Sequence, residues 1–221
     1  MAGAWFRRLA LLGALVLLVG CGGDDDASGP TTLDIGGTAT ARGEAAWPAP
    51  PSDQVAALAD DAGLPLETKE HLAYHVHAHL DVFIDGEDRI VPAGIGIVID
   101  DPGVRTFEEL GGTGYGGIEG CDQPCISPLH THFTTGVLHT ESQETKANTL
   151  GQFFVEWDVA LTETCVGDYC TPDTPIRVFV DGEEQPLAGA ADIELTDRRE
   201  IALVIGDPPS RIPDSADFSH D

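Results

Sequence analysis

The strongest pattern in the chain is an alternation of polar and apolar residues between positions 74 and 84. Successive side chains of a β-strand point to opposite faces, so this alternation predicts a strand with one polar face and one apolar face. The apolar face is expected to carry Val76, Ala78, Leu80, Val82 and Ile84. The polar face is expected to carry His75, His77, His79 and Asp81. Core packing accounts for the apolar row, whereas a row of histidines indicates a metal site, because neutral imidazole is the commonest metal ligand.

A second cluster of histidines is expected on a β-hairpin whose arms are 128–132 and 137–141. In this register His130 faces His139. One face of the hairpin is then expected to carry His130, His132, His139 and Glu141. Directly paired residues have Cβ atoms roughly 4.5–5.5 Å apart, so two facing imidazoles can share one metal ion. A joint site requires this hairpin to meet the strand at 74–84.

Aspartate–glycine turns indicate two further hairpins. The turn at 85–88 is expected to return the chain as a strand through 89–99, with Pro92 at a sheet edge or a bulge. The apolar run and Asp-Gly-Glu turn of residues 82–87 recur in similar form at 178–183. We therefore expect two similar hairpins in one β-rich domain.

Helices are scarce in the sequence pattern. Ser52 is expected to cap a short helix that continues through Ala59. Thr149 and Gln152 have the spacing of a capping box, and apolar residues recur at helical intervals as far as Trp157. This second short helix is expected to pack on the sheet.

The N-terminus predicts export. Arg7 and Arg8 precede an apolar run at 9–19 that is too short to span a bilayer of roughly 30 Å, which is typical of a signal peptide. Residues 18–21 read Leu-Val-Gly-Cys and resemble a bacterial lipobox. The resemblance implies that Cys21 is diacylated and becomes the first residue of the mature protein. The alternative is a plain secretory peptide that leaves Cys21 unmodified in the tail.

These patterns divide the chain into three parts. Residues 1–20 are expected to be a lipoprotein signal peptide, 21–51 a flexible tether, and 52–221 one folded domain. Two more strands are expected at 193–195 and 201–205. The expected fold class is mainly β, a single antiparallel β-sandwich or barrel-like domain with one or two short helices. We expect this domain on the extracytoplasmic face of the cell membrane, held there by the lipid anchor.

The charge of the chain limits its partners. The formal net charge is −27, from 38 acidic and 11 basic residues. A field of this sign repels phosphate backbones and argues against nucleic-acid binding. The membrane and a metal ion remain as expected partners, and the sequence names no protein partner.

Four cysteines follow the one in the lipobox, an even number in a chain predicted to be exported. This arithmetic favours two disulfides, and we prefer the local pairs Cys121 with Cys125 and Cys165 with Cys170. A cross-link between the two loops is an alternative. Ligation of a metal by cysteine thiolates is another, because Cys125 lies shortly before His130.

The segment 111–117 is rich in glycine and reads Gly-Gly-Thr-Gly-Tyr-Gly-Gly. A phosphate-binding loop follows a strand and contains a lysine, and the pattern predicts neither feature here. We expect this segment to form a flexible loop over the site.

Several motifs together resemble a family of exported bacterial proteins with no assigned activity. The resemblance covers roughly residues 64 to 218 and rests on the segments 75–83, 91–96, 126–132, 136–141 and 149–154. These segments include a His-x-His-x-His-Leu motif and a Leu-His-Thr-His motif, and the His-Thr-His element is fairly specific. The resemblance implies a shared layout and no particular chemistry.

The function we favour is a membrane-anchored lipoprotein that binds copper or zinc, since imidazole suits both ions. The candidate ligands are His75, His77, His79, His130, His132 and His139. A single ion would use three or four of them. Asp81 and Glu141 are candidates to orient an imidazole, and Glu141 also to bind the metal itself.

Two other functions remain open. One is a metalloenzyme with three histidine ligands and a bound water, in which Glu141 or Asp81 acts as general base. The other is a structural or recognition domain without metal, whose histidines become cationic near their ordinary pKa of roughly 6.5. Non-catalytic metal binding is favoured because no signature of a nucleophilic catalytic triad occurs in the sequence.

Overall fold

The computed structural model of the chain describes residues 47–109 and 112–218. The predicted signal peptide, the predicted lipid-bearing Cys21 and most of the predicted tether lie outside the described residues. Within the described ranges, no helix is both long enough and apolar enough to cross a membrane.

Most of the regular structure is strand. In chain order the strands are β1 (Tyr74–Ile84), β2 (Glu87–Arg89), β3 (Arg105–Glu109), β4 (Gly112–Gly116), β5 (Leu129–His130), β6 (Val137–Ser142), β7 (Cys165–Val166), β8 (Tyr169–Cys170), β9 (Ile176–Val180), β10 (Glu183–Gln185) and β11 (Arg199–Ile205). The helices are α1 (Ser52–Asp61), α2 (Leu150–Glu156) and the 3₁₀ turn η1 (Ala190–Asp192). The prediction of a mainly β domain with one or two short helices is therefore confirmed.

Seven strands form the main sheet, in the order β10-β9-β11-β1-β6-β5, with β2 paired to β1. Strands β3 and β4 form a separate hairpin, as do β7 and β8. All these pairs are antiparallel except β1 with β11, which is parallel. Turn signals predict pairing only between strands that are neighbours in the sequence, so this parallel pair was not predicted. No closed barrel forms among the described strands.

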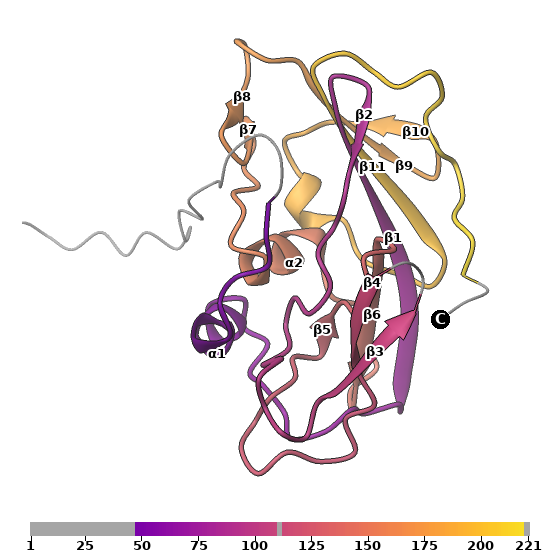
Figure 1. Ribbon diagram of the computed structural model, residues 1–221. Helices are drawn as coiled ribbons and strands as arrows, with labels where there is room; N and C mark the ends of the chain where they lie inside the picture. Colours follow the sequence, from indigo (N-terminus) through magenta and orange to yellow (C-terminus); the bar gives the residue numbers. More distant parts are fainter. Residues whose placement is uncertain (1–46, 110–111, 219–221) are drawn as a thin grey trace, which may run out of the picture. The chain divides into compact units, whose positions relative to one another are not determined.

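The apolar face of β1 packs into the core as predicted. The buried residues of this face are Ala78, Leu80, Val82 and Ile84. Helix α2 lies against the sheet (Figure 1) and contributes to the same core Leu150, Phe153 and Phe154, with Trp157 just after it. Because the strand alternates, this packing directs the histidine row to the opposite face of the sheet.

The two helices begin differently. The Thr149 side chain accepts a hydrogen bond from the Gln152 amide, and the Gln152 side chain accepts one from the Thr149 amide. The predicted capping box of α2 is therefore confirmed. Helix α1 is capped by Pro51 without any side-chain hydrogen bond, so the prediction that Ser52 caps it is wrong. Ser52 is instead its first helical residue.

Packing starts before the predicted domain boundary at residue 52. Trp47 is buried in the main core, with its ring edge against Trp157. The Trp157 indole N–H donates a hydrogen bond to the Trp47 carbonyl at 3.2 Å. The end of the segment predicted as a tether is therefore part of the folded domain.

The two repeated turns close similar hairpins, as predicted. Asp85 and Gly86 have φ of 52° and 81°, and Asp181 and Gly182 have φ of 51° and 80°. Two successive positive φ angles match the twist of an antiparallel hairpin, and aspartate followed by glycine tolerates them best. These turns join β1 to β2 and β9 to β10.

The prediction of a long return strand at 89–99 is wrong. Strand β2 ends at Arg89, and the chain then turns through Gly94 and Gly96, whose φ angles are 81° and 73°. A side chain on Gly96 would collide with the Leu129 carbonyl. The glycines therefore allow a tight path past the start of β5, which a regular strand would not follow.

Two further predictions need correction. Residues 193–195 do not form a strand, because only one isolated bridge joins Glu194 to Thr149. Segment 111–117 was expected to be a flexible loop, but β4 pairs along its length with β3. The strand predicted at 201–205 is present within β11.

Both local disulfides are present. Cys121 is bonded to Cys125, and Cys165 to Cys170. Disulfides are typical of domains outside the cytoplasm. Asp101 lies close enough to Cys121 and Cys125 to form a potential metal-binding group, but disulfide sulfurs are not thiolates and do not replace them as ligands.

Candidate metal centre

Three histidines from three strands lie in one row across the sheet. His77 of β1 is opposite His139 of β6, and His139 is in turn opposite His130 of β5. The ring centroids of His77 and His139 are 4.4 Å apart, and those of His130 and His139 are 5.5 Å apart. The predicted facing of His130 and His139 is confirmed, and the two histidine clusters meet.

His132 lies beyond the end of β5 and is held by β4. Its Nδ1 donates a hydrogen bond to the Tyr115 carbonyl at 2.6 Å, and the Tyr115 amide donates to the His132 carbonyl at 3.0 Å. Glycines on both sides of Tyr115 make this contact possible. A Cβ on Gly116 would lie 2.7 Å from the His132 ring, and one on Gly114 would overlap Phe133.

Hydrogen bonds to backbone carbonyls fix the orientation of two imidazoles. His130 Nδ1 donates to the Ser127 carbonyl at 2.9 Å, as His132 Nδ1 does to Tyr115. Because a carbonyl only accepts, both Nδ1 atoms carry hydrogen, and in neutral rings both Nε2 atoms carry lone pairs. These two Nε2 atoms are 3.3 Å apart. Two nitrogens on one tetrahedral zinc, with bonds of about 2.0–2.1 Å, are about 3.3–3.4 Å apart.

A buried carboxylate completes this group. Glu141 is 6 % exposed, and its Oε1 lies 3.6 Å from His139 Nδ1 and 3.9 Å from His132 Nε2. Neither Glu141 Oε2 nor His139 Nδ1 has a hydrogen-bond partner. We call His130, His132, His139 and Glu141 the inner group; each offers a donor atom within 4.8 Å of the others.

Burial keeps most of these imidazoles neutral. It lowers the pKa of His130 well below its ordinary value and that of His139 to about 4, and the neighbouring His132 adds to both effects. Burial also acts to lower the pKa of His132, but the Glu141 carboxylate and the Tyr115 carbonyl outweigh it and raise that pKa. For Glu141, burial opposes ionisation, yet the neighbouring imidazoles of His132 and His139 lower its pKa far below the ordinary value. The group therefore combines the neutral imidazoles of His130 and His139 with a carboxylate anion, the protonation states that bind metals.

Two more histidines adjoin the inner group. His75 Nε2 lies 2.8 Å from His77 Nε2 and 3.2 Å from Glu141 Oε1. With His139 they form a second set of three donors within 4.8 Å of one another. We call His75, His77 and His139 the outer group, because the His75 side chain is 36 % exposed.

His79 lies in a separate group with two carboxylates. In the register of β1 with β6 it is opposite Val137, so the cross-strand row of histidines ends before it. Its Nε2 donates to the Thr135 carbonyl at 2.9 Å, and its Nδ1 lies 3.0 Å from Glu200 and 3.9 Å from Asp81. Burial lowers the pKa of His79, but the two carboxylates reverse this and raise it. Both ring nitrogens of His79 are therefore already engaged.

Sequence patterns did not reveal two buried carboxyls near these groups. Glu200 directly precedes the apolar run 201–205 of β11, and Glu156 directly follows the apolar run 153–155 of α2; each is 1 % exposed. The Ser127 hydroxyl donates a hydrogen bond to Glu156, and the Ser127 carbonyl holds His130. The sequence signal for both was an acidic residue directly beside an apolar run.

Replacing Glu156 with glutamine is expected to stabilise the protein at neutral pH. Burial raises the pKa of Glu156 well above 4.5, and the Ser127 hydroxyl opposes this only in part. Above pH 4.5 the unfolded chain releases this proton while the folded chain keeps it, so wild-type stability falls as pH rises towards the folded pKa. The loss is about 1.4 kcal/mol per unit of pKa difference. Glutamine does not ionise, so the variant does not undergo this loss of stability.

Urea unfolding of the Glu156→Gln variant measures this effect. As pH rises, the free energy of unfolding of the variant should increase relative to that of wild type. Below pH 4.5 the difference between the two free energies should not depend on pH. Glu183→Gln, at an exposed position of β10, serves as the control for the loss of one exposed carboxylate. If the unfolding free energies of wild type and Glu156→Gln change in parallel with pH, Glu156 is ionised in the folded protein and the prediction is wrong.

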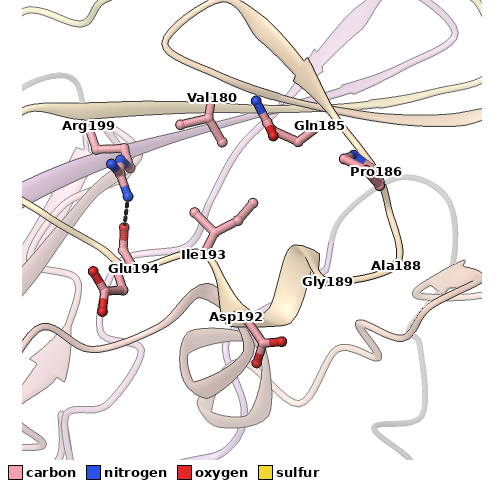
Figure 2. A pocket seen from close by; sticks show the side chains of 9 residues that line it. All are labelled: Val180, Gln185, Pro186, Ala188, Gly189, Asp192, Ile193, Glu194 and Arg199. Carbon is pink, nitrogen blue, oxygen red and sulfur yellow. Dashed lines mark hydrogen bonds between the residues drawn. The ribbon is translucent and has the colours of Figure 1, made fainter.

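An open hollow away from the histidines contains a different set of side chains. It measures about 520 Å³ and lies between the β9–β10 hairpin and the turn around η1 (Figure 2). None of its nine lining residues is histidine or cysteine. Arg199, its only cationic residue, donates a hydrogen bond to the Glu194 carbonyl, drawn as a dashed line in Figure 2. The clustered histidines, not this hollow, are therefore the candidate site.

The chain thus contains groups of histidine and acidic side chains that can hold a metal ion. Imidazole and carboxylate ligands suit several transition metals, so the donors alone do not select one ion. Comparison with models of protein families, with curated proteins and with solved structures finds no match to this chain.

Proposed function

We propose that the protein is an exported, lipid-anchored protein that holds a copper or zinc ion through His130, His132, His139 and Glu141. The observation that carries this proposal is the 3.3 Å approach of His130 Nε2 and His132 Nε2. In neutral rings both nitrogens present lone pairs, because the single ring hydrogen is on each Nδ1 atom, which donates it to a carbonyl. Two facing lone pairs repel each other; a proton on one nitrogen relieves this with a single hydrogen bond, whereas a metal ion uses both lone pairs as ligands.

The surroundings support metal binding over a purely structural role. Glu141 supplies a negative charge that offsets the ion, and its unpaired Oε2 gains a partner when metal binds. Metal-bound histidines usually donate their other N–H to a carbonyl or carboxylate, as His130 and His132 do here. Imidazole nitrogens suit copper and zinc, with copper the tighter by the general affinity order.

The proposed location rests on the N-terminal sequence and the disulfides. Residues 18–21 have the Leu-Val-Gly-Cys pattern of a lipobox, and acylation of Cys21 would hold the domain at the outer face of the membrane. Two disulfides fit an oxidising compartment. The proposed partners are thus the membrane, through the lipid, and the metal ion, and the acidic chain has no role in nucleic-acid binding.

Metal titration followed by nitrogen NMR tests this function. The full chain, purified without a histidine tag, is loaded with zinc and dialysed. At least one ion should remain per chain, with His130 and His132 protonated at Nδ1 and metal-bound at Nε2. His79 is the internal control, since both its nitrogens are engaged and its spectrum should not change. If neither zinc nor copper remains after dialysis, the proposal is wrong.

A further inference from the structure

We infer that the outer group binds a second metal ion, so that the inner and outer groups form one two-metal centre joined at His139. This inference rests on the proposed function, because the second ion is placed beside the first. The outer group, His75, His77 and His139, comes from β1 and β6.

The number of donors favours two ions. Zinc in proteins takes four ligands, and the inner group supplies four. His75 and His77 are then left over, although both lie in the same patch as His139. Three protein ligands with one free position are the usual set for a metal site that also binds water or a small ligand. The outer group has that composition.

His139 is placed to join the two sites. It belongs to both groups, and its ring lies 4.4 Å from the His77 ring and 4.4 Å from the His132 ring. Its ring has two nitrogens, and loss of the N–H proton to solvent when the metals bind leaves a lone pair on each, so the imidazolate can ligate one ion with each nitrogen. Glu141 reinforces the link, because its Oε1 lies near both His75 Nε2, at 3.2 Å, and His139 Nδ1, at 3.6 Å.

The two sites differ in their access to solvent. In the inner group His130 is fully buried and the His132 side chain is 16 % exposed. The outer group reaches the surface at His75, whose side chain is 36 % exposed. An ion in the outer group can therefore exchange or take a small anion from solution, whereas the inner ion is shielded. The ligand class we assign to the outer ion is a small anion or water.

Copper loading of the full chain tests the inference. Wild type should retain two Cu(II) ions per chain by elemental analysis, with an electron paramagnetic resonance signal reduced or split by coupling between them. Added azide should change the optical spectrum. The variant His75→Ala/His77→Ala should retain one ion, give the signal of an isolated Cu(II), and no longer respond to azide. His79→Ala, on the same strand and outside both groups, should match wild type.

The outcomes separate the two proposals. One ion in wild type, unchanged in His75→Ala/His77→Ala, overturns the second site and leaves the proposed function standing. No bound ion in wild type overturns both, beginning with the proposed function. Two ions without magnetic coupling overturn the link through His139. If the double variant fails to fold, His75→Gln at the exposed position must still abolish the azide response, or the outer site is wrong.

Discussion

Replacing His130 and His132 together with alanine is expected to weaken copper and zinc binding at the inner group by more than about 100-fold. Loss of a group that only orients a ligand already costs about 10–100-fold in affinity. This double change removes two of the four inner donors and both lone pairs that converge at 3.3 Å. Titration against a chelator of known affinity measures the loss.

Thermal unfolding gives an independent measure of the same effect. A ligand that binds only the folded chain stabilises it by about 2.7 kcal/mol when its free concentration is 100 times its dissociation constant. Wild type should show this stabilisation on adding zinc, and the double variant should not.

His130 is fully buried, so its loss can also destabilise the metal-free chain. His132→Ala alone, at a partly exposed position, separates the two effects. It should fold like wild type and still lose most of its affinity. Wild-type affinity in His132→Ala would contradict the ligand set.

Substituting Gly116 with alanine should weaken metal binding about 10–100-fold, although Gly116 offers no ligand. A Cβ at this position would lie 2.7 Å from His132 Nδ1, closer than real Cβ atoms approach, and only 3.0 Å from its Cε1. The ring would have to move and lose its hydrogen bond to the Tyr115 carbonyl. The same chelator titration measures the change, and nitrogen NMR of His132 reports the displaced ring.

Gly112→Ala is the matched control for this prediction. Gly112 begins the same strand, β4, but its Cβ would come only within 3.6 Å of Thr134 Oγ1, an ordinary contact. Its affinity for metal should equal that of wild type. Equal affinities in Gly116→Ala and wild type would show that the packing of β4 on His132 does not position the ligand.

Several features of the fold followed from local patterns. The alternation at 74–84, the capping box at Thr149 and the two aspartate–glycine turns were each predicted correctly. Each depends on residues close together in the chain, through strand geometry, helix capping or allowed φ angles. The prediction of a strand at 89–99 was wrong, because the path of this segment depends on the close approach of Gly96 to Leu129. That contact joins segments that are distant in the sequence, and local patterns do not reveal it.

The candidate site also combines features that local patterns predicted with features that they did not. The pairing of His130 with His139 followed from a short hairpin loop, and the sheet brings His77 to the same row. His79 shares the face and spacing of His77, yet it lies with Asp81 and Glu200 instead. That separation depends on where β6 ends against β1 and on the position of β11, neither of which alternation along β1 specifies.

The sequence by itself determined which residues of the strand at 74–84 face away from the core and that histidines would gather on this strand and on one hairpin, because side-chain direction alternates along any strand. Tertiary structure alone decided that these strands are neighbours and that β4 holds His132. It also decided that Glu141 is buried among imidazoles, where its charge favours a cation. These features depend on contacts between distant segments, and long-range pairing is set by the packing of the whole domain.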